Sequence, residues 1–268
     1  MANRIDRRFR ELNEKNKKAF IAYITAGDPS LAVTSKLVGI LENSGVDILE
    51  LGIPFSDPLA DGPTIQAASQ RALKAKTTLS RIFDMVGSLR TETDIPIVFM
   101  TYYNPVFRYG LEAFFEECKF KGVDGVIIPD LPYEETKDAL KSARKHGIAV
   151  ILLIAPTSTR KRVKDIAKSS SGFIYYVSLT GVTGTRKSLP EEVKSKVRQI
   201  KSVSNVPVCV GFGVSNARQA AAIANVADGV IVGSAIIKVI EGNLANKDRM
   251  LSKVSSFAKY LSKAIHSV

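Results

Sequence analysis

The sequence predicts an α/β fold in which residues 1–268 form a single-domain (β/α)8 barrel, also called a TIM barrel. Three observations predict it. Short apolar segments alternate with amphipathic ones to the end of the chain, eight β–α units of about 30 residues nearly fill it, and no Pro- or Ser-rich linker divides it. A doubly wound sheet is the alternative, but the turn after the first strand, Gly27-Asp28-Pro29-Ser30, lacks a G-x-G-x-x-G dinucleotide pattern.

Each predicted strand is a short run rich in β-branched residues. Most of these runs are continuously apolar rather than alternating, which is typical of parallel strands covered on both faces. The predicted strands are residues 20–25, 47–51, 96–100, 125–128, 149–154, 173–178, 207–210 and 229–232.

The predicted helices are amphipathic segments between these strands. They include residues 31–42, 111–121, 134–145, 160–168, 191–201 and 217–225. Gly45, Gly122 and Gly147 follow helical patterns, as C-terminal glycines of helices do. An extra helix over 3–16 caps the N-terminus, and a short helix over 235–240 follows the eighth strand. His146, just before Gly147, is interpreted as the end of a helix.

Composition and charge exclude several classes of protein. The longest apolar run, 148–155, is far shorter than the roughly 20 residues of a membrane helix, and the N-terminus has no signal-peptide core. Cys118 and Cys209 form no metal or redox motif, which favours a reducing compartment, so we expect a cytoplasmic protein without a metal site. The net charge of +12 is spread over helix faces. It therefore predicts steering of an anionic substrate rather than nucleic-acid binding.

Two carboxylates near the second strand are candidates for acid–base chemistry. Glu50 lies among apolar residues at the strand's carboxyl end, where barrels hold their active sites. Burial there raises the pKa of a carboxyl group, which suits acid–base catalysis. The alternative interpretation of Glu50 is a structural glutamate in a polar layer of the barrel interior. Asp61 follows in a Pro-rich loop and either flanks the same substrate or forms a turn or helix cap. Asp57, before Pro58, is interpreted as a turn residue.

The loops after the last three strands indicate a phosphate site. Residues 181–186, GVTGTR, form a small polar loop that either closes over a substrate or is a surface connector. Glycines at 211, 213 and 233 let backbone N–H groups approach a ligand, or let helices pack closely. A helix beginning near Ser234 would add free N–H groups and a positive dipole end. The sequence thus predicts a lyase or isomerase acting on a small phosphate ester.

These segments are similar, over almost the whole chain, to the tryptophan synthase α-subunit family. The most specific motif is residues 49–66, LELGIPFSDPLADGPTIQ. Residues 102–105 (YYNP), 128–132 (IPDLP) and 181–184 (GVTG) support it. The resemblance implies retro-aldol cleavage of indole-3-glycerol phosphate to indole and glyceraldehyde 3-phosphate, with Glu50 transferring both protons and Asp61 at the indole N–H.

The resemblance also implies binding residues. Tyr175 positions the substrate, and Thr183 lies on a closing loop that contacts Asp61. The remaining implied residues line the indole pocket or hold the phosphate: Tyr23, Met100, Tyr102 and Ile127 for the pocket, and Gly184, Gly213, Gly233 and Ser234 for the phosphate.

A partner and a cofactor follow from the same resemblance. The family's α-subunit works with a β-subunit that carries pyridoxal phosphate, in an α2β2 complex, so this chain is expected to hold no cofactor itself. Residues 54–58 and 103–107 match the family's interface regions. A stand-alone lyase that releases free indole shares the same site residues and is the alternative.

Overall fold

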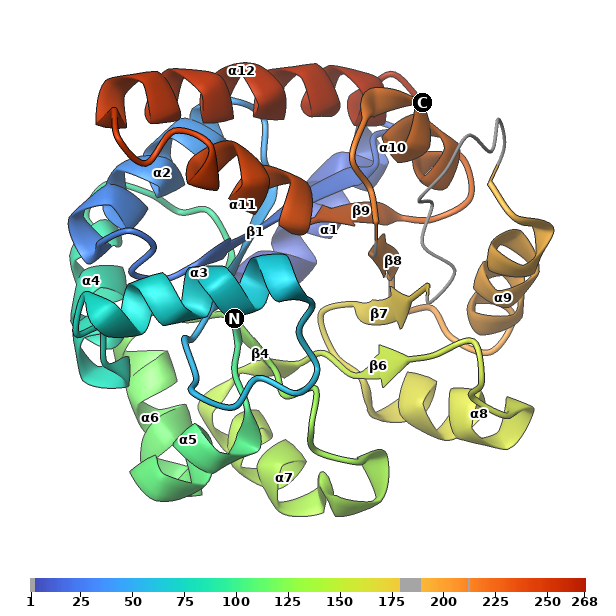
Figure 1. The fold of residues 1–268 in the computed structure, drawn as a ribbon. Helices are drawn as coiled ribbons and strands as arrows, with labels where there is room; N and C mark the ends of the chain where they lie inside the picture. The colour runs from blue at the N-terminus through green and yellow to red at the C-terminus, as the bar shows by residue number, and fades with distance from the viewer. Residues whose placement is uncertain (1–2, 179–188, 212) are drawn as a thin grey trace.

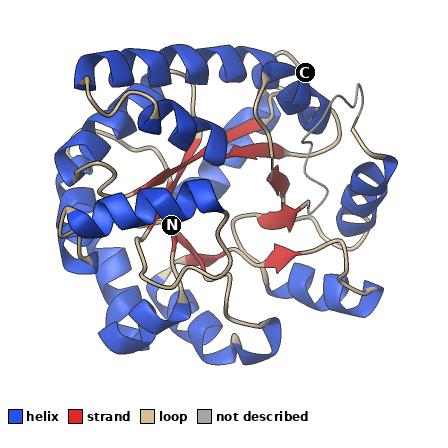
Figure 2. Cartoon of the chain, in the orientation of Figure 1, coloured by secondary structure: helices blue, strands red, loops and turns tan. Residues whose placement is uncertain are grey.

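The structure is a computed structural model that describes residues 3–178, 189–211 and 213–268. A sheet of parallel strands curls around the centre of the molecule, and helices cover its outer face (Figure 1). Figure 2 shows the same arrangement by element type, with strands inside and helices outside. No helix in the described part of the chain is both long and apolar enough to cross a membrane.

The elements alternate along the chain. The strands are β1 (Ala19–Thr25), β2 (Ile48–Gly52), β3 (Ile97–Met100), β4 (Gly125–Ile127), β5 (Ala149–Val150), β6 (Leu153–Ile154), β7 (Ile174–Val177), β8 (Val208–Gly211) and β9 (Gly229–Val232). The helices are α1 (Arg4–Glu14), α2 (Leu31–Asn43), α3 (Pro63–Lys74), α4 (Leu79–Leu89), α5 (Tyr103–Tyr109), α6 (Leu111–Lys121), α7 (Lys137–His146), α8 (Arg160–Ser169), α9 (Glu191–Lys201), α10 (Ala217–Ala224), α11 (Ser234–Glu241) and α12 (Lys247–His266), with a 3₁₀ turn, η1 (Tyr133–Glu135).

The sheet closes on itself through the stretch that contains β5 and β6. The strand order is β5-β4-β3-β2-β1-β9-β8-β7-β6, so these two short strands are its ends. Between them, the Ile151 N–H donates to the Val126 carbonyl of β4 (3.0 Å), and the Tyr175 N–H of β7 donates to the Leu152 carbonyl (3.1 Å). The barrel fold predicted from the sequence is confirmed.

The prediction of one continuous strand over residues 149–154 was wrong. Residues 149–154 form two strands of two residues each, because pairing passes from β4 to β7 in the middle of the stretch. The other predicted strands agree with the structure to within one residue at each end. The helix predicted over 134–145 begins as η1 and continues as α7, while α3, α4, α5 and α12 lie outside the predicted ranges.

The core has an outer and an inner part. Alternate strand residues point to opposite faces, so Leu49 and Leu51 of β2 pack in the larger cluster, which includes the buried faces of the helices. Ile48 faces inward and packs with Val98 and Ile151. Helix α1 adds Ile5 and Leu12 to this inner cluster, as the predicted N-terminal cap should. Helix α1 does not contribute to the candidate active site, which lies at the carboxyl ends of the strands.

Candidate active site

A cavity of about 780 Å³ lies at the carboxyl ends of the strands. Its wall includes Tyr23 of β1, Glu50 of β2, Met100 of β3 and Tyr175 of β7. The loop residue Asp61 and the first residues of α3 and α11 complete the wall. Residues distant in the sequence therefore meet where barrel enzymes hold their substrates.

Glu50 points into this cavity because of the strand's alternation. Its neighbours Leu49 and Leu51 face the helices, so Glu50 faces inward with Ile48. The residue is 1% exposed, and its Oε2 has no hydrogen-bond partner within the described residues. Burial, together with the nearby Asp61 carboxylate, raises the pKa of Glu50 to about 8. At neutral pH this carboxyl group therefore carries a proton that it can donate.

Asp61 is held in the loop between β2 and α3. The Gln66 side chain donates to the Asp61 carbonyl (2.9 Å), and the Ala60 N–H donates to the Tyr102 hydroxyl (2.9 Å). Burial raises the pKa of Asp61 to about 6, while a hydrogen bond from Tyr102 lowers it. Asp61 is thus ionised at neutral pH when Glu50 is not. Two carboxyl groups with separated pKa values suit separate acid and electrostatic roles.

Two tyrosines lie near Glu50. Tyr23 is buried and Tyr175 is half-buried. Loss of solvent contact raises the pKa of each hydroxyl well above its usual value, and the charge of Glu50 adds to both shifts. Gly52 and Gly211 make room for them, since a Cβ at these positions would lie 2.1 Å and 2.5 Å from the Tyr23 and Tyr175 hydroxyl oxygens. The sequence patterns did not single out either glycine for this role. Their position two residues beyond an inward-facing side chain was the available signal.

The predicted phosphate-binding site lies at the start of α11. Gly213, Gly233 and Ser234 all line the cavity. Gly213 has a φ of 71°, which favours glycine, and α11 begins at Ser234 directly after Gly233. The first N–H groups of a helix have no acceptor within it, so those of α11 are available to an anion. The short helix predicted after the eighth strand is confirmed.

The remaining candidates fall in different places. Met100 lines the cavity, whereas Ile127 packs in the inner core and is absent from the cavity wall. Tyr102 reaches the site through Asp61 and Ala60 rather than through the wall. Thr183 and Gly184 lie outside the described residues. Their roles, like those of all the site residues, stay predictions.

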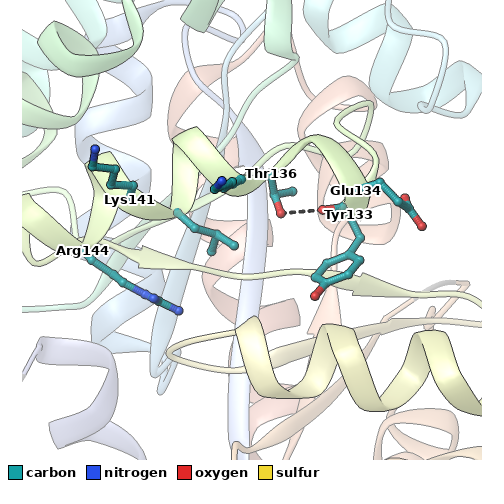
Figure 3. A pocket seen from close by; sticks show the side chains of 7 residues that line it. Tyr133, Glu134, Thr136, Lys141 and Arg144 are labelled. Carbon is teal, nitrogen blue, oxygen red and sulfur yellow. Dashed lines mark hydrogen bonds between the residues drawn. The ribbon is translucent and has the colours of Figure 1, made fainter.

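A second hollow of about 550 Å³ lies on the outer wall, formed by η1 and α7 (Figure 3). Its lining includes Tyr133 and Arg144, and Thr136 donates a hydrogen bond to the Tyr133 carbonyl (2.7 Å). Its one carboxylate, Glu134, forms an ion pair with Arg162 (2.7 Å). It holds no candidate residue and shares no lining residue with the first cavity. Within the described residues, no group of three or more His, Cys, Asp or Glu could hold a metal ion.

Comparison with known proteins identifies the family. Residues 9–266 match the family model described as tryptophan synthase alpha chain. This chain belongs to that family. A tryptophan synthase alpha chain from Geobacter sulfurreducens is 49% identical to it, over 98% of this chain and 99% of the relative. A second, from Caldanaerobacter subterraneus subsp. tengcongensis, is 49% identical over 95% and 97%.

Solved structures agree with this family assignment. The crystal structure of tryptophan synthase subunit alpha from Legionella pneumophila has a TM-score of 0.92 to this chain, at 38% identity and with full coverage of both chains. A Mycobacterium tuberculosis tryptophan synthase structure has a TM-score of 0.90, at 35% identity and 99% coverage of each chain. The fold and the family therefore rest on independent similarities of sequence and structure.

Proposed function

We propose that this chain, as a tryptophan synthase α subunit, cleaves indole-3-glycerol phosphate to indole and glyceraldehyde 3-phosphate and that Glu50 and Asp61 carry the reaction. Family membership supports the substrate. The observation that carries the assignment of Glu50 is its buried carboxyl group, with Oε2 unpartnered among the described residues and the pKa at about 8. Such a group retains a proton at neutral pH and faces the cavity where a substrate would lie.

The reaction needs two proton transfers. Glu50 donates its proton to C3 of the indole ring, which turns the ring into an electron acceptor. The hydroxyl group on the adjoining glycerol carbon then loses its proton to the Glu50 carboxylate. The bond between that carbon and C3 breaks, its electron pair restores the indole, and the glycerol carbon becomes the aldehyde. Glu50 ends the cycle protonated, so one residue serves as acid and base.

Asp61 supplies the complementary charge. Protonation of C3 places positive charge on the indole nitrogen, and an ionised carboxylate accepts a hydrogen bond from that N–H. Because Asp61 has a pKa of about 6, it is ionised at the pH at which Glu50 is protonated. A fixed charge aimed at a developing charge lowers a barrier by roughly 3–4 kcal/mol when the site excludes water.

The phosphate would be held at the start of α11. The free N–H groups at the start of α11, the Ser234 hydroxyl and the glycine-lined turn at Gly213 are suited to a phosphate. Gly184 and Thr183 belong to the same proposal through the family motif. Tyr175, Tyr23 and Met100 would contact the substrate between phosphate and carboxylates.

The partner is a β-subunit in an α2β2 complex, which carries the pyridoxal phosphate and receives the indole. Residues 54–58 and 103–107 are the regions proposed to meet it. Phe107 is 68% exposed, and Leu59, just beyond the first region, is 94% exposed, so both apolar side chains are available to a partner. Phe55 stacks on Tyr102, with ring centroids 5.2 Å apart. This surface therefore adjoins Tyr102, the residue that donates a hydrogen bond to Asp61. A cytoplasmic location, one domain over residues 1–268 and the absence of a cofactor from this chain remain proposals.

Indole release from purified protein tests the assignment. We expect slow cleavage of indole-3-glycerol phosphate by the chain alone and a strong increase on addition of a tryptophan synthase β-subunit. Full activity without the β-subunit would favour the stand-alone lyase. Absence of cleavage in both cases, from protein shown to be folded by circular dichroism, would refute the proposed substrate.

A further inference from the structure

We propose that Lys238 binds the phosphate group of the substrate and gives the site its preference for a doubly charged phosphate ester. Neither the sequence patterns nor the family motifs single out this residue. The inference rests on the proposed function, because it concerns how a phosphorylated substrate is held.

Lys238 lies on the helix whose first turn is predicted to hold the phosphate. Lys238 lines the same cavity as Gly233 and Ser234. It lies on α11, four residues after Ser234, so the two side chains share one face of the helix, about 6 Å apart along its axis. Helical side chains lean toward the N-terminus, and a long lysine side chain therefore extends back over the turn that contains Ser234. Its ammonium group can reach the predicted phosphate-binding site.

Lys238 also differs in charge from the other residues that line the cavity. Among the described residues that line the cavity, Lys238 is the only lysine or arginine, whereas Glu50 and Asp61 supply two carboxyl groups. A substrate with an indole at one end and a phosphate at the other would be oriented by these charges, because Lys238 attracts the phosphate and the carboxylates repel it.

Lys238 is available to a ligand because no described carboxylate pairs with it. No ion pair joins it to any described residue. At the C-terminal end of the same helix, by contrast, a charged side chain is paired. There, Glu241 pairs with Arg71 (2.9 Å), and Arg71 also contacts the buried Asp28 (2.8 Å). Arg71 is therefore occupied in linking α3, α11 and the loop after β1. Lys238 is exposed and keeps its full charge available to a ligand.

The expected contribution follows from the helix terminus and the lysine together. The N-terminus of α11 supplies about half a positive charge, which is less than the charge of a phosphate dianion. Lys238 adds a full charge nearby. Because the side chain is exposed, solvent and salt screen it, and we expect an effect of about tenfold on phosphate binding rather than a larger one.

The test compares Lys238→Gln with Lys238→Arg and with Lys253→Gln. Lys253 lies on α12, which packs against α11, is exposed and has no ion pair among the described residues, so its replacement removes the same charge outside the cavity. The measurements are KM and kcat for indole-3-glycerol phosphate, the inhibition constant of glycerol 3-phosphate and the dissociation constant of indole. Thermal unfolding establishes that each variant is folded.

For Lys238→Gln we expect KM and the inhibition constant of glycerol 3-phosphate to rise about tenfold, while kcat changes less than threefold and indole binding is unchanged. The decrease of kcat/KM with added salt becomes shallower. Lys238→Arg keeps most of the affinity, and Lys253→Gln behaves as the wild type. Unchanged phosphate affinity in folded, active Lys238→Gln would overturn the inference alone. A wild-type chain without cleavage activity would instead overturn the proposed function, and glycerol 3-phosphate binding would still report on Lys238.

Discussion

Both ends of the barrel bury carboxyl groups, but only one end supplies these groups with hydrogen-bond and ion-pair partners. At the amino ends of the strands, Asp124 is 4% exposed and receives bonds from Arg4 (3.1 Å), Arg90 (2.9 Å) and the Ile97 N–H (2.9 Å). At the carboxyl ends, Glu50 is 1% exposed and its Oε2 has no partner among the described residues. Burial is thus nearly the same at the two ends, and the partners differ.

This difference separates a structural acid from a reactive one. Burial raises the pKa of Asp124, but two arginines and a backbone N–H act against that rise and favour its ionised form. Nothing comparable opposes burial at Glu50, and Asp61 adds to the rise, so its pKa reaches about 8. A buried carboxyl group that has been left unpaired costs stability, which is expected where the group takes part in chemistry.

The largest expected effect comes from replacing Glu50. Glu50→Gln preserves the shape of the side chain but removes its titratable proton. We expect kcat for indole-3-glycerol phosphate cleavage to fall by about 10³, within the range of lost acid–base catalysis, while glycerol 3-phosphate still binds. A kcat within tenfold of the wild type would break the comparison, because Glu50 would then be no more reactive than Asp124.

The matching change at the other end should affect stability instead. Asp124→Asn leaves Arg4 and Arg90 without their shared carboxylate, and we expect the free energy of unfolding to fall by about 3 kcal/mol. Urea unfolding measures this loss. The fraction that remains folded should keep the wild-type kcat. A tenfold lower kcat in fully folded Asp124→Asn protein would show that this end also serves the reaction.

Replacing Asp61 should remove electrostatic help without removing the proton donor. For Asp61→Asn we expect kcat to fall by about 10². The change also removes a neighbouring negative charge, so the pKa of Glu50 should decrease toward neutrality. The activity that remains should therefore decline at a lower pH on the basic side, and an unmoved basic limb would contradict the coupling between the two carboxyl groups.

The smallest effect is expected at Tyr102. Its hydroxyl accepts the Ala60 N–H and lowers the pKa of Asp61. Tyr102→Phe should reduce kcat/KM by about threefold at pH 8, in line with the loss of one hydrogen bond. Asp61 must be ionised to act, so its higher pKa in this variant should move the acidic limb of the pH profile upward. An acidic limb that stays in place would remove Tyr102 from this role.

Much of the fold was predictable from local patterns. The alternation of apolar and amphipathic segments located the barrel strands, and the spacing of residues 235–240 located α11. The split of residues 149–154 was not predictable, because it depends on which neighbour each half pairs with across the barrel. Helix α5 lies outside the predicted ranges, and its seven residues are too few to show a clear helical period.

The site was predictable in its members more than in its geometry. An inward-facing glutamate at a strand end follows from period-two alternation, and glycines before α11 follow from the needs of a phosphate. The unpartnered state of Glu50 Oε2 depends on what the other strands bring to the cavity, which one strand's sequence does not contain. The placement of Ile127 in the inner core depends likewise on the depth of β4 in the barrel.

The protonation of Glu50 at neutral pH can be measured directly. Infrared difference spectra of the wild type against Glu50→Gln, recorded from pH 5 to pH 9.5, would follow its carboxyl band directly. We predict a protonated band at pH 7 that is lost as the pH rises through about 8, because burial holds the proton above the usual range. A carboxylate band already present at pH 6 would contradict the account.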